Sequence, residues 1–161
     1  MQKALSSMVL ATVFALGASS PALGQSTAHS PSAGCALPDI PRSEIYTFYS
    51  PALKRPICAA VIRPPLGHPA PSDGYPLLVL LHGLGGAPAD WFGIARFHER
   101  LAAARARFGF PPAYVVIPLG EAGYWSDARD GQRPWRTMVL DELLPGIDDP
   151  ARFPGLARSP E

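Results

Sequence analysis

Two short segments in the first half of the chain alternate apolar and polar positions. The segments "SEIYTFYS" at 43–50 and "ICAAVIRPP" at 57–65 are rich in β-branched and aromatic residues, and a "PALKRP" turn lies between them. Alternation with a period of two on both sides of a turn is typical of a β-hairpin. The pattern therefore predicts two antiparallel strands.

A continuous apolar run follows, "YPLLVLLH" at 75–82. Unbroken apolar character is typical of a strand that is buried on both faces, so we predict a central strand here. After a glycine turn, Asp90 is placed to cap a helix. The apolar positions of that helix recur with the helical period and predict a face that packs on the sheet; they are Trp91, Ile94, Ala95, His98, Leu101 and Ala102.

The run "AYVVIP" at 113–118 predicts a second buried strand. Strand, helix and strand form a βαβ unit, which implies a parallel, right-handed crossover. Beyond a long loop, the segment "RPWRTMVLDELLP" at 133–145 predicts a further helix that Pro145 stops or kinks near Leu144. Together the elements predict an α/β fold in which a β-hairpin precedes a βαβ unit and a further helix.

The first residues carry the pattern of a secretory signal peptide. Lys3 precedes an apolar run at 8–18, and small residues lead to Gly24. The run is too short for a permanent membrane span, and a buried N-terminal helix is the less favoured alternative because no polar face accompanies the run. We predict a secreted or periplasmic protein with a signal peptide at 1–24, a flexible linker at 25–42 and a domain at 43–161.

Composition and charge narrow the function. The 161 residues are 47% hydrophobic and 17% charged, which suits one globular domain, and the formal net charge is +1. Such a balance gives no electrostatic basis for binding nucleic acid or an anionic membrane. Cys35 and Cys58 are the only cysteines, and in an exported chain both a disulfide and two free thiols remain open. The four histidines lack paired ligand spacing, so no metal or other cofactor is predicted.

The glycine turn "HGLGG" at 82–86 has two chemical uses. A phosphate-binding loop ends in Gly-Lys-Ser/Thr, but this turn has no lysine, and Pro88 stands where a dinucleotide fingerprint has Gly or Ala. Asp90 would also repel a phosphate at the helix N-terminus. The other use is acyl transfer, in which backbone N–H groups stabilise the charge that grows on a carbonyl oxygen. A turn without any chemistry is the third alternative.

Three blocks carry a resemblance to a known family. The blocks "YPLLVLLHGLGGAPADW", "PPAYVVIPLGEAGYWSD" and "PWRTMVLDELLPGID" resemble the esterase family of the α/β-hydrolase superfamily that includes tributyrin-type and feruloyl esterases, S-formylglutathione hydrolases and mycolyl-transferring enzymes. The resemblance covers residues 43–148 and implies a small-molecule ester as substrate. It implies that the backbone N–H of Leu84 belongs to the oxyanion hole. It also implies a serine nucleophile in Gly-x-Ser-x-Gly, with an acid and a histidine later in the chain.

The sequence departs from this family beyond the turn. The only later serines are Ser126 and Ser159, neither in such an elbow, and the only later histidine is His98. A hidden triad would join Ser126 and His98 to Asp127 or Asp130, but nothing in the spacing brings them together. We therefore expect the N-terminal half of a hydrolase, truncated before the nucleophile elbow and inactive alone.

Two alternatives stay open. In the first, the chain is a non-catalytic secreted module that binds a glycan or lipid through its tryptophans. In the second, it is half of a two-chain esterase that a C-terminal half completes. The tryptophans are Trp91, Trp125 and Trp135, which core packing explains equally well. We expect His82 to brace the loop through hydrogen bonds, and His98 to pack on the inward face of its helix.

Overall fold

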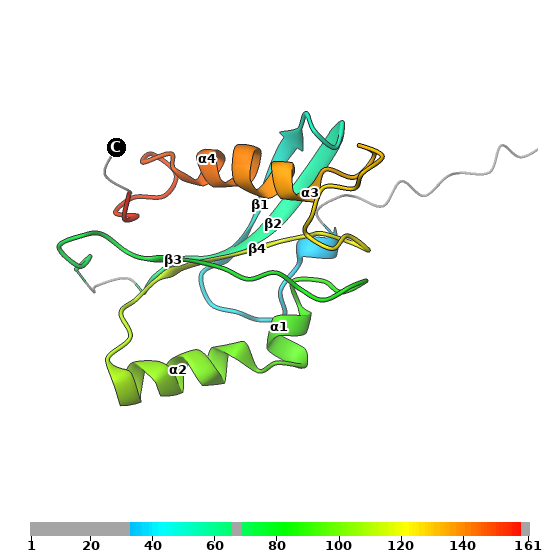
Figure 1. The fold of residues 1–161 in the computed structure, drawn as a ribbon. Helices are drawn as coiled ribbons and strands as arrows, with labels where there is room; N and C mark the ends of the chain where they lie inside the picture. Colours follow the sequence, from blue (N-terminus) through cyan, green and yellow to red (C-terminus); the bar gives the residue numbers. More distant parts are fainter. Residues whose placement is uncertain (1–32, 66–68, 159–161) are drawn as a thin grey trace, which may run out of the picture.

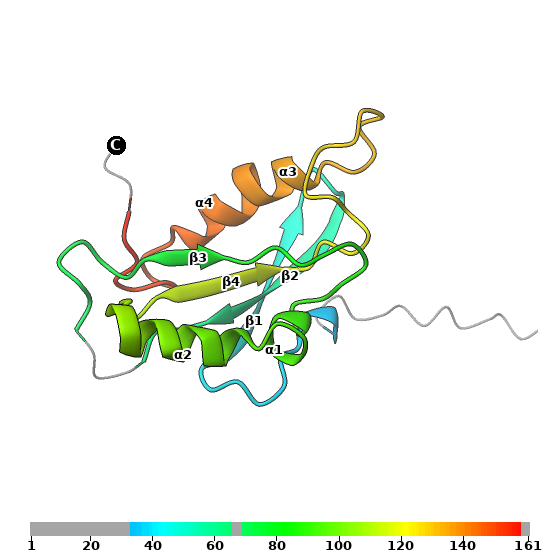
Figure 2. The same cartoon turned by 60° about the horizontal axis from the view of Figure 1, so that its bottom comes forward.

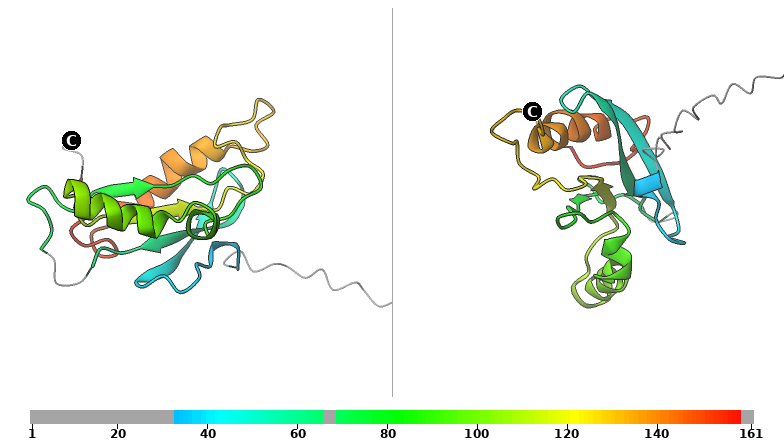
Figure 3. Two further views of the ribbon diagram at one scale, coloured as in Figure 1. Left: turned by 90° about the horizontal axis from the view of Figure 1, so that it is seen from below. Right: turned by 90° about the vertical axis from the view of Figure 1, so that its right-hand side faces the viewer.

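The computed structural model describes residues 33–65 and 69–158. The predicted signal peptide at 1–24 and the predicted linker up to residue 32 lie outside the described residues. One four-stranded sheet forms the middle of the molecule, and helices cover both of its faces (Figure 1). Viewed along the sheet, the two helical layers lie on opposite sides (Figure 3).

The predicted hairpin is confirmed. Strand β1 (Ser43–Ser50) pairs antiparallel with β2 (Arg55–Ile62) in a register that joins Ser43 to Ile62. Strand β2 also pairs antiparallel with β4 (Tyr114–Pro118), and β4 pairs in parallel with β3 (Leu77–Val79). The strand order is therefore β1-β2-β4-β3 (Figure 2). The parallel β3–β4 pair, with helices between the two strands in sequence, confirms the βαβ unit.

The prediction of a buried strand is right for β4, whereas the prediction of a central strand buried on both faces is wrong for β3. Every residue of β4 is buried, because β4 has a neighbouring strand on each side and helices on both faces. Strand β3 has only three residues, all half-buried, and lies at the edge of the sheet in the described part of the chain. Strand β3 is therefore less buried than its continuous apolar sequence predicts.

The single helix predicted after the glycine turn is two helices. Helix α1 (Asp90–Gly93) ends before Arg96, which adopts a left-handed conformation with φ of 49°, and α2 (Phe97–Phe108) begins directly after Arg96. The break interrupts the predicted apolar face: Ile94 is 81% exposed, whereas Trp91 and Leu101 stay half-buried. Phe92 and Phe97 pack against the sheet together with Trp91.

Two further local predictions need correction. The carboxylate of Asp90 accepts the N–H of Ala87 at 2.9 Å, so it closes the turn before α1 and is not the cap residue. Pro145 does not end the last helix near Leu144. Helix α3 (Trp135–Thr137), the π-helical segment η2 (Met138–Leu143) and α4 (Leu144–Ile147) follow one another without a gap. Pro145 lies where the π-helical segment passes into α4, and the change of hydrogen-bond pattern at this point accommodates its missing N–H.

Two apolar clusters hold these layers together. The α3–η2–α4 layer packs on β1, β2 and β4 through Tyr46, Val61, Tyr114, Met138 and Phe153, among others. On the other face, Phe92 packs with Ala60, Val115 and Ile117. None of the described helices is long and apolar enough to cross a bilayer.

A disulfide joins Cys35 to Cys58, which decides between the two states that the sequence left open. Cys35 ends a short 3₁₀-helix, η1 (Ala33–Cys35), and Cys58 lies in β2; both are fully buried. The bond ties the stretch before β1 to the sheet. From Ala33 onward, the predicted flexible linker is therefore anchored by the cross-link and by Leu37 and Ile40, which pack against the sheet.

Candidate functional site

The glycine turn leaves the C-terminal end of β3 and is held in one shape. The N–H of Gly86 donates to the carbonyl of Gly83 at 3.0 Å and closes the turn. Gly85 has φ of 69°, a left-handed conformation that favours glycine. Its N–H donates to the carbonyl of Glu121 at 3.1 Å, so the loop after β4 supports the loop after β3.

His82 braces this turn, as the sequence predicts. The side chain is 4% exposed, and its Nε2 accepts the N–H of Gly120 at 2.8 Å. Nδ1 lies 2.8 Å from the carbonyl of Gly83. Because Nε2 accepts, the proton is assigned to Nδ1, which donates to that carbonyl. Both ring nitrogens are thus engaged, and neither is free to act as a base.

Trp125 completes the brace from the loop after β4. Its Nε1–H donates to the carbonyl of His82 at 2.8 Å, and its ring meets the imidazole edge-on at 5.0 Å between centroids. The indole also lies directly over Gly120, where no side chain would fit. The turn is therefore fixed by contacts on two sides.

Leu84 lies at the tip of the braced turn. Its side chain is 60% exposed, and no hydrogen bond to its N–H is found within the described ranges. Leu84 lines a cavity of about 290 Å³ together with Gly83, Asp90 and Trp91. A rigid loop that presents an unengaged N–H beside a cavity has the features of an anion-stabilising site.

The residues of a hidden triad are not brought together. Asp127 accepts the N–H of Thr137 at 3.0 Å and its hydroxyl at 2.9 Å, so it fixes the start of the last helix. The bond from the Thr137 backbone is the main cause that lowers the pKa of the Asp127 carboxyl. Asp130 accepts the N–H of Gln132 at 3.0 Å within its own loop. Ser126 lines a small hollow near Trp135.

His98 lies elsewhere. It lines a separate cavity beneath α2, and its Nε2 is 3.7 Å from Oε1 of Glu99. Its ring stacks on Phe92 at 6.1 Å between centroids. His98 thus lies on the sheet side of α2, as the sequence predicts, but at the boundary of the core, since its side chain is 50% exposed.

The tryptophans do not form a shared platform. Trp125 and Trp135 pack against each other at 6.3 Å between centroids, and Trp135 is 4% exposed. Of the three, Trp91 alone lines the cavity beside Leu84. Across residues 33–65 and 69–158, no three His, Cys, Asp or Glu side chains are grouped as a metal site would require.

Comparison with known proteins supports the fold. No family model and no curated protein matches the chain. The structure of a ferulic acid esterase is similar to this chain, with a TM-score of 0.55 and 20% identity. The alignment covers 70% of this chain and 45% of the esterase chain. The described residues therefore share part of the α/β fold of that esterase. The predicted resemblance and α/β fold class are thereby confirmed at the level of the fold.

Two further structures align over similar shares. The alignment with the BES protein from Bacillus cereus covers 76% of this chain and 50% of that protein, at 20% identity and a TM-score of 0.49. The alignment with an S-formylglutathione hydrolase from Agrobacterium tumefaciens covers 65% of this chain and 42% of the hydrolase, at 18% identity and a TM-score of 0.48. The chain thus spans about half the length of the solved structures that it matches.

Sequence reasoning found the turn and His82 but missed Gly120, Glu121 and Trp125. A histidine between an apolar strand and a glycine turn is a local signal. The Trp125 bond joins positions 43 residues apart. Only the parallel pairing of β3 with β4 brings those two loops together, and no pattern within either loop indicates it.

Proposed function

We propose that this chain is the oxyanion-hole half of an exported, serine-type carboxylic ester hydrolase or acyltransferase. The observation that carries the proposal is the N–H of Leu84, which has no acceptor among the described residues and lies in a braced turn beside a cavity. In this role the N–H stabilises the negative charge that forms on the ester carbonyl oxygen. Because His82 and Gly120 hold the turn, the donor needs no reorganisation when that charge appears.

The reaction has two stages. A serine attacks the ester carbonyl, and the alcohol leaves as an acyl-enzyme forms. Water or another acceptor then releases the acyl group. This chain supplies the Leu84 N–H, worth about 3 kcal/mol of barrier by analogy with other oxyanion donors. The nucleophile and base come from other residues, since Ser126 and His98 line separate cavities.

The edge of β3 supports a completing half. Tyr75, just before β3, forms a parallel bridge with Leu156. Along Leu77–Val79 the described residues place no strand beyond β3. A half-buried apolar strand with an open edge is a template for pairing. We therefore propose that a C-terminal half, on the same or a second polypeptide, adds a strand here and carries the nucleophile elbow.

Export is part of the proposal. The Cys35–Cys58 disulfide is typical of an oxidising compartment and supports the signal peptide at 1–24. N-terminal sequencing of protein recovered from the periplasm or medium tests it, with a new N-terminus at Gln25 expected. Recovery of the chain only from the cytoplasm, with Met1 retained, contradicts it.

A non-catalytic module that binds a glycan or lipid is the second candidate. The cavity beside Leu84 favours a binding module, because Trp91 lines this cavity and the neighbouring Ile94 is exposed. Such a module binds ligand without hydrolysing an ester, whether or not a C-terminal half is present.

The decisive experiment uses a chromogenic short-chain ester. The purified chain alone is expected to give no turnover above its own Leu84→Pro variant, which lacks the N–H. The nucleotides after the Glu161 codon are then read for a Gly-x-Ser-x-Gly elbow, and the completed protein is assayed. There, Leu84→Pro is expected to lower kcat about 100-fold or more, whereas Leu84→Ala keeps the N–H and the rate. Turnover by the chain alone that Ser126→Ala abolishes refutes the proposal.

A further inference from the structure

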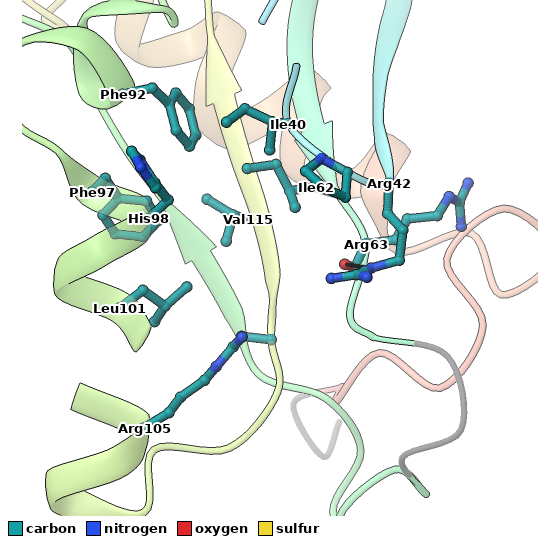
Figure 4. Close-up of a pocket in the computed structure, with 12 residues that line it drawn as sticks. Ile40, Arg42, Ile62, Arg63, Phe92, Phe97, His98, Leu101, Arg105 and Val115 are labelled. Carbon is teal, nitrogen blue, oxygen red and sulfur yellow. Dashed lines mark hydrogen bonds between the residues drawn. The ribbon is translucent and has the colours of Figure 1, made fainter. Parts of the chain in front are cut away.

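A second cavity, of about 210 Å³, lies between α2 and the sheet (Figure 4). It shares no lining residue with the cavity beside Leu84. Part of its wall is apolar: Phe97 and Leu101 come from α2, and Ile62 and Val115 come from β2 and β4. The space is smaller than the roughly 300 Å³ at which pockets for drug-sized ligands begin. A short apolar chain suits it.

Two arginines without a counter-ion line the same cavity. Nε of Arg105 is buried and has no hydrogen-bond partner among the described residues. Arg42 also lines the cavity, and its charge acts on Arg105. Burial, and then repulsion by Arg42, lower the pKa of Arg105. Arg42 is exposed to solvent, so water screens part of this repulsion, but the buried Nε of Arg105 remains an unsatisfied donor that an anionic head group would satisfy.

The nearest carboxylates are already engaged. Arg63, the third arginine of the cavity, pairs with Glu44 at 2.8 Å and donates to the carbonyl of Arg152 at 2.9 Å. Glu99, beside His98, pairs with Arg96 at 2.6 Å. No ion pair to Arg42 or Arg105 is found over residues 33–65 and 69–158.

The backbone at Arg42 is itself unusual. Its φ is 62°, a left-handed conformation that is strained for a residue with a long side chain. Nε of Arg42 donates to the carbonyl of Arg63 at 3.3 Å, which ties the side chain to the end of β2. The strained residue is thus also a cationic wall of the cavity, and strain of this kind concentrates at binding sites.

We propose that this cavity binds a short amphiphilic anion. Its apolar chain lies between α2 and the sheet, against Phe97, Leu101 and Val115. Its carboxylate or phosphate head group lies between Arg42 and Arg105 and supplies the missing acceptor for Nε of Arg105. The site is independent of the ester chemistry proposed for Leu84, because the two cavities have no residue in common.

Calorimetry on the purified exported chain tests the ligand class. Octanoate and octyl phosphate carry the two head groups, and the better binder identifies the source of the anion. Each is expected to bind at least tenfold more tightly than octan-1-ol and octyltrimethylammonium, which lack the negative charge. Acetate and inorganic phosphate lack the chain and are expected to bind at least tenfold more weakly. Equal affinity for octan-1-ol, or for inorganic phosphate alone, overturns the proposal.

Variants of α2 test the site. Arg105→Met keeps the apolar stem and is expected to weaken octanoate binding at least tenfold, whereas Arg105→Lys keeps the charge and loses less than threefold. The matched control is Arg107→Met, which removes the same charge from the same helix outside the cavity. An equal loss in Arg107→Met overturns the proposal, because general surface charge would then explain the binding.

A measurement on the unaltered protein covers the case in which a variant fails to fold. Adding octanoate is expected to shift the NMR signals of the Leu101 and Val115 methyl groups, which line the cavity. Saturable shifts confined to residues of the Leu84 cavity overturn the proposal.

Discussion

Nε2 of His82 accepts the N–H of Gly120 at 2.8 Å, although the two residues lie 38 positions apart. The bond joins the turn after β3 to the turn after β4, so it holds the C-terminal ends of two parallel strands at one edge of the sheet. Ligands of open α/β sheets bind beyond these strand ends. The brace therefore fixes the part of the molecule where chemistry is expected, and Leu84 lies on it.

Replacing His82 by Ala is expected to destabilise the fold by about 2–4 kcal/mol, because two buried hydrogen bonds and a packed ring are lost. Urea unfolding of the oxidised chain measures the change. His98→Ala is the matched control, since His98 is exposed, and we expect a change within about 0.5 kcal/mol. Faster hydrogen exchange at Gly120 in His82→Ala would locate the loss, whereas unchanged exchange would contradict the brace.

The sequence predicts what short-range pattern determines. Period-two alternation at 43–50 and an apolar run at 113–118 correctly predict β1 and β4. The break between α1 and α2 depends on a left-handed Arg96, and arginine gives no local signal for that conformation. The half-burial of β3 depends on which strands flank it, and the apolar sequence of β3 gives no information about its neighbouring strands.

The candidate site shows the same division. Leu84 and His82 lie in one contiguous motif that the sequence alone singles out. The brace from Gly120 and Trp125 arises only when two loops meet across the sheet. The cavity of Arg42 and Arg105 joins residues from two distant segments and gives no motif at all. Local chemistry is thus predictable, while its supports require the fold.

The Cys35–Cys58 disulfide is expected to contribute about 3 kcal/mol, because it closes a loop with a sequence separation of 23 and so restricts the unfolded chain. Reduction should lower the urea midpoint of the natural chain by the corresponding amount. The Cys35→Ala, Cys58→Ala double variant is expected to match the reduced protein and to show no further response to reductant. If reductant leaves the urea midpoint of the natural chain unchanged, the disulfide does not stabilise the fold as expected.

Asp127 is expected to make stability depend on pH in acid. Hydrogen bonds from Thr137 lower its pKa in the folded state below the ordinary value of 3.8. A depressed folded pKa stabilises the fold above the unfolded value, and that contribution disappears as pH falls from about 3.8 through the folded pKa. Urea midpoints of the natural chain and Asp127→Asn should therefore differ at pH 6 and converge in strong acid. Asp130→Asn serves as the control, and a gap that persists unchanged in acid would contradict the assignment.

Two glycine substitutions separate close packing from helix propensity. A Cβ on Gly120 would overlap the Trp125 ring, whereas a Cβ on Gly93 meets nothing within 4 Å. Gly120→Ala is therefore expected to cost about 1–3 kcal/mol through overpacking. Gly93→Ala is expected to be neutral or to stabilise α1 by up to about 1 kcal/mol.

A second change at Trp125 tests the cause of that loss. If the overlap with the indole is responsible, Gly120→Ala combined with Trp125→Phe is less destabilised than the sum of the two single variants, because the smaller ring makes room for the methyl group. Urea unfolding of the four proteins gives this coupling. Strict additivity would mean that the indole is not what excludes a side chain at Gly120, and the contribution of Trp125 to the brace would then be limited to its hydrogen bond to the carbonyl of His82.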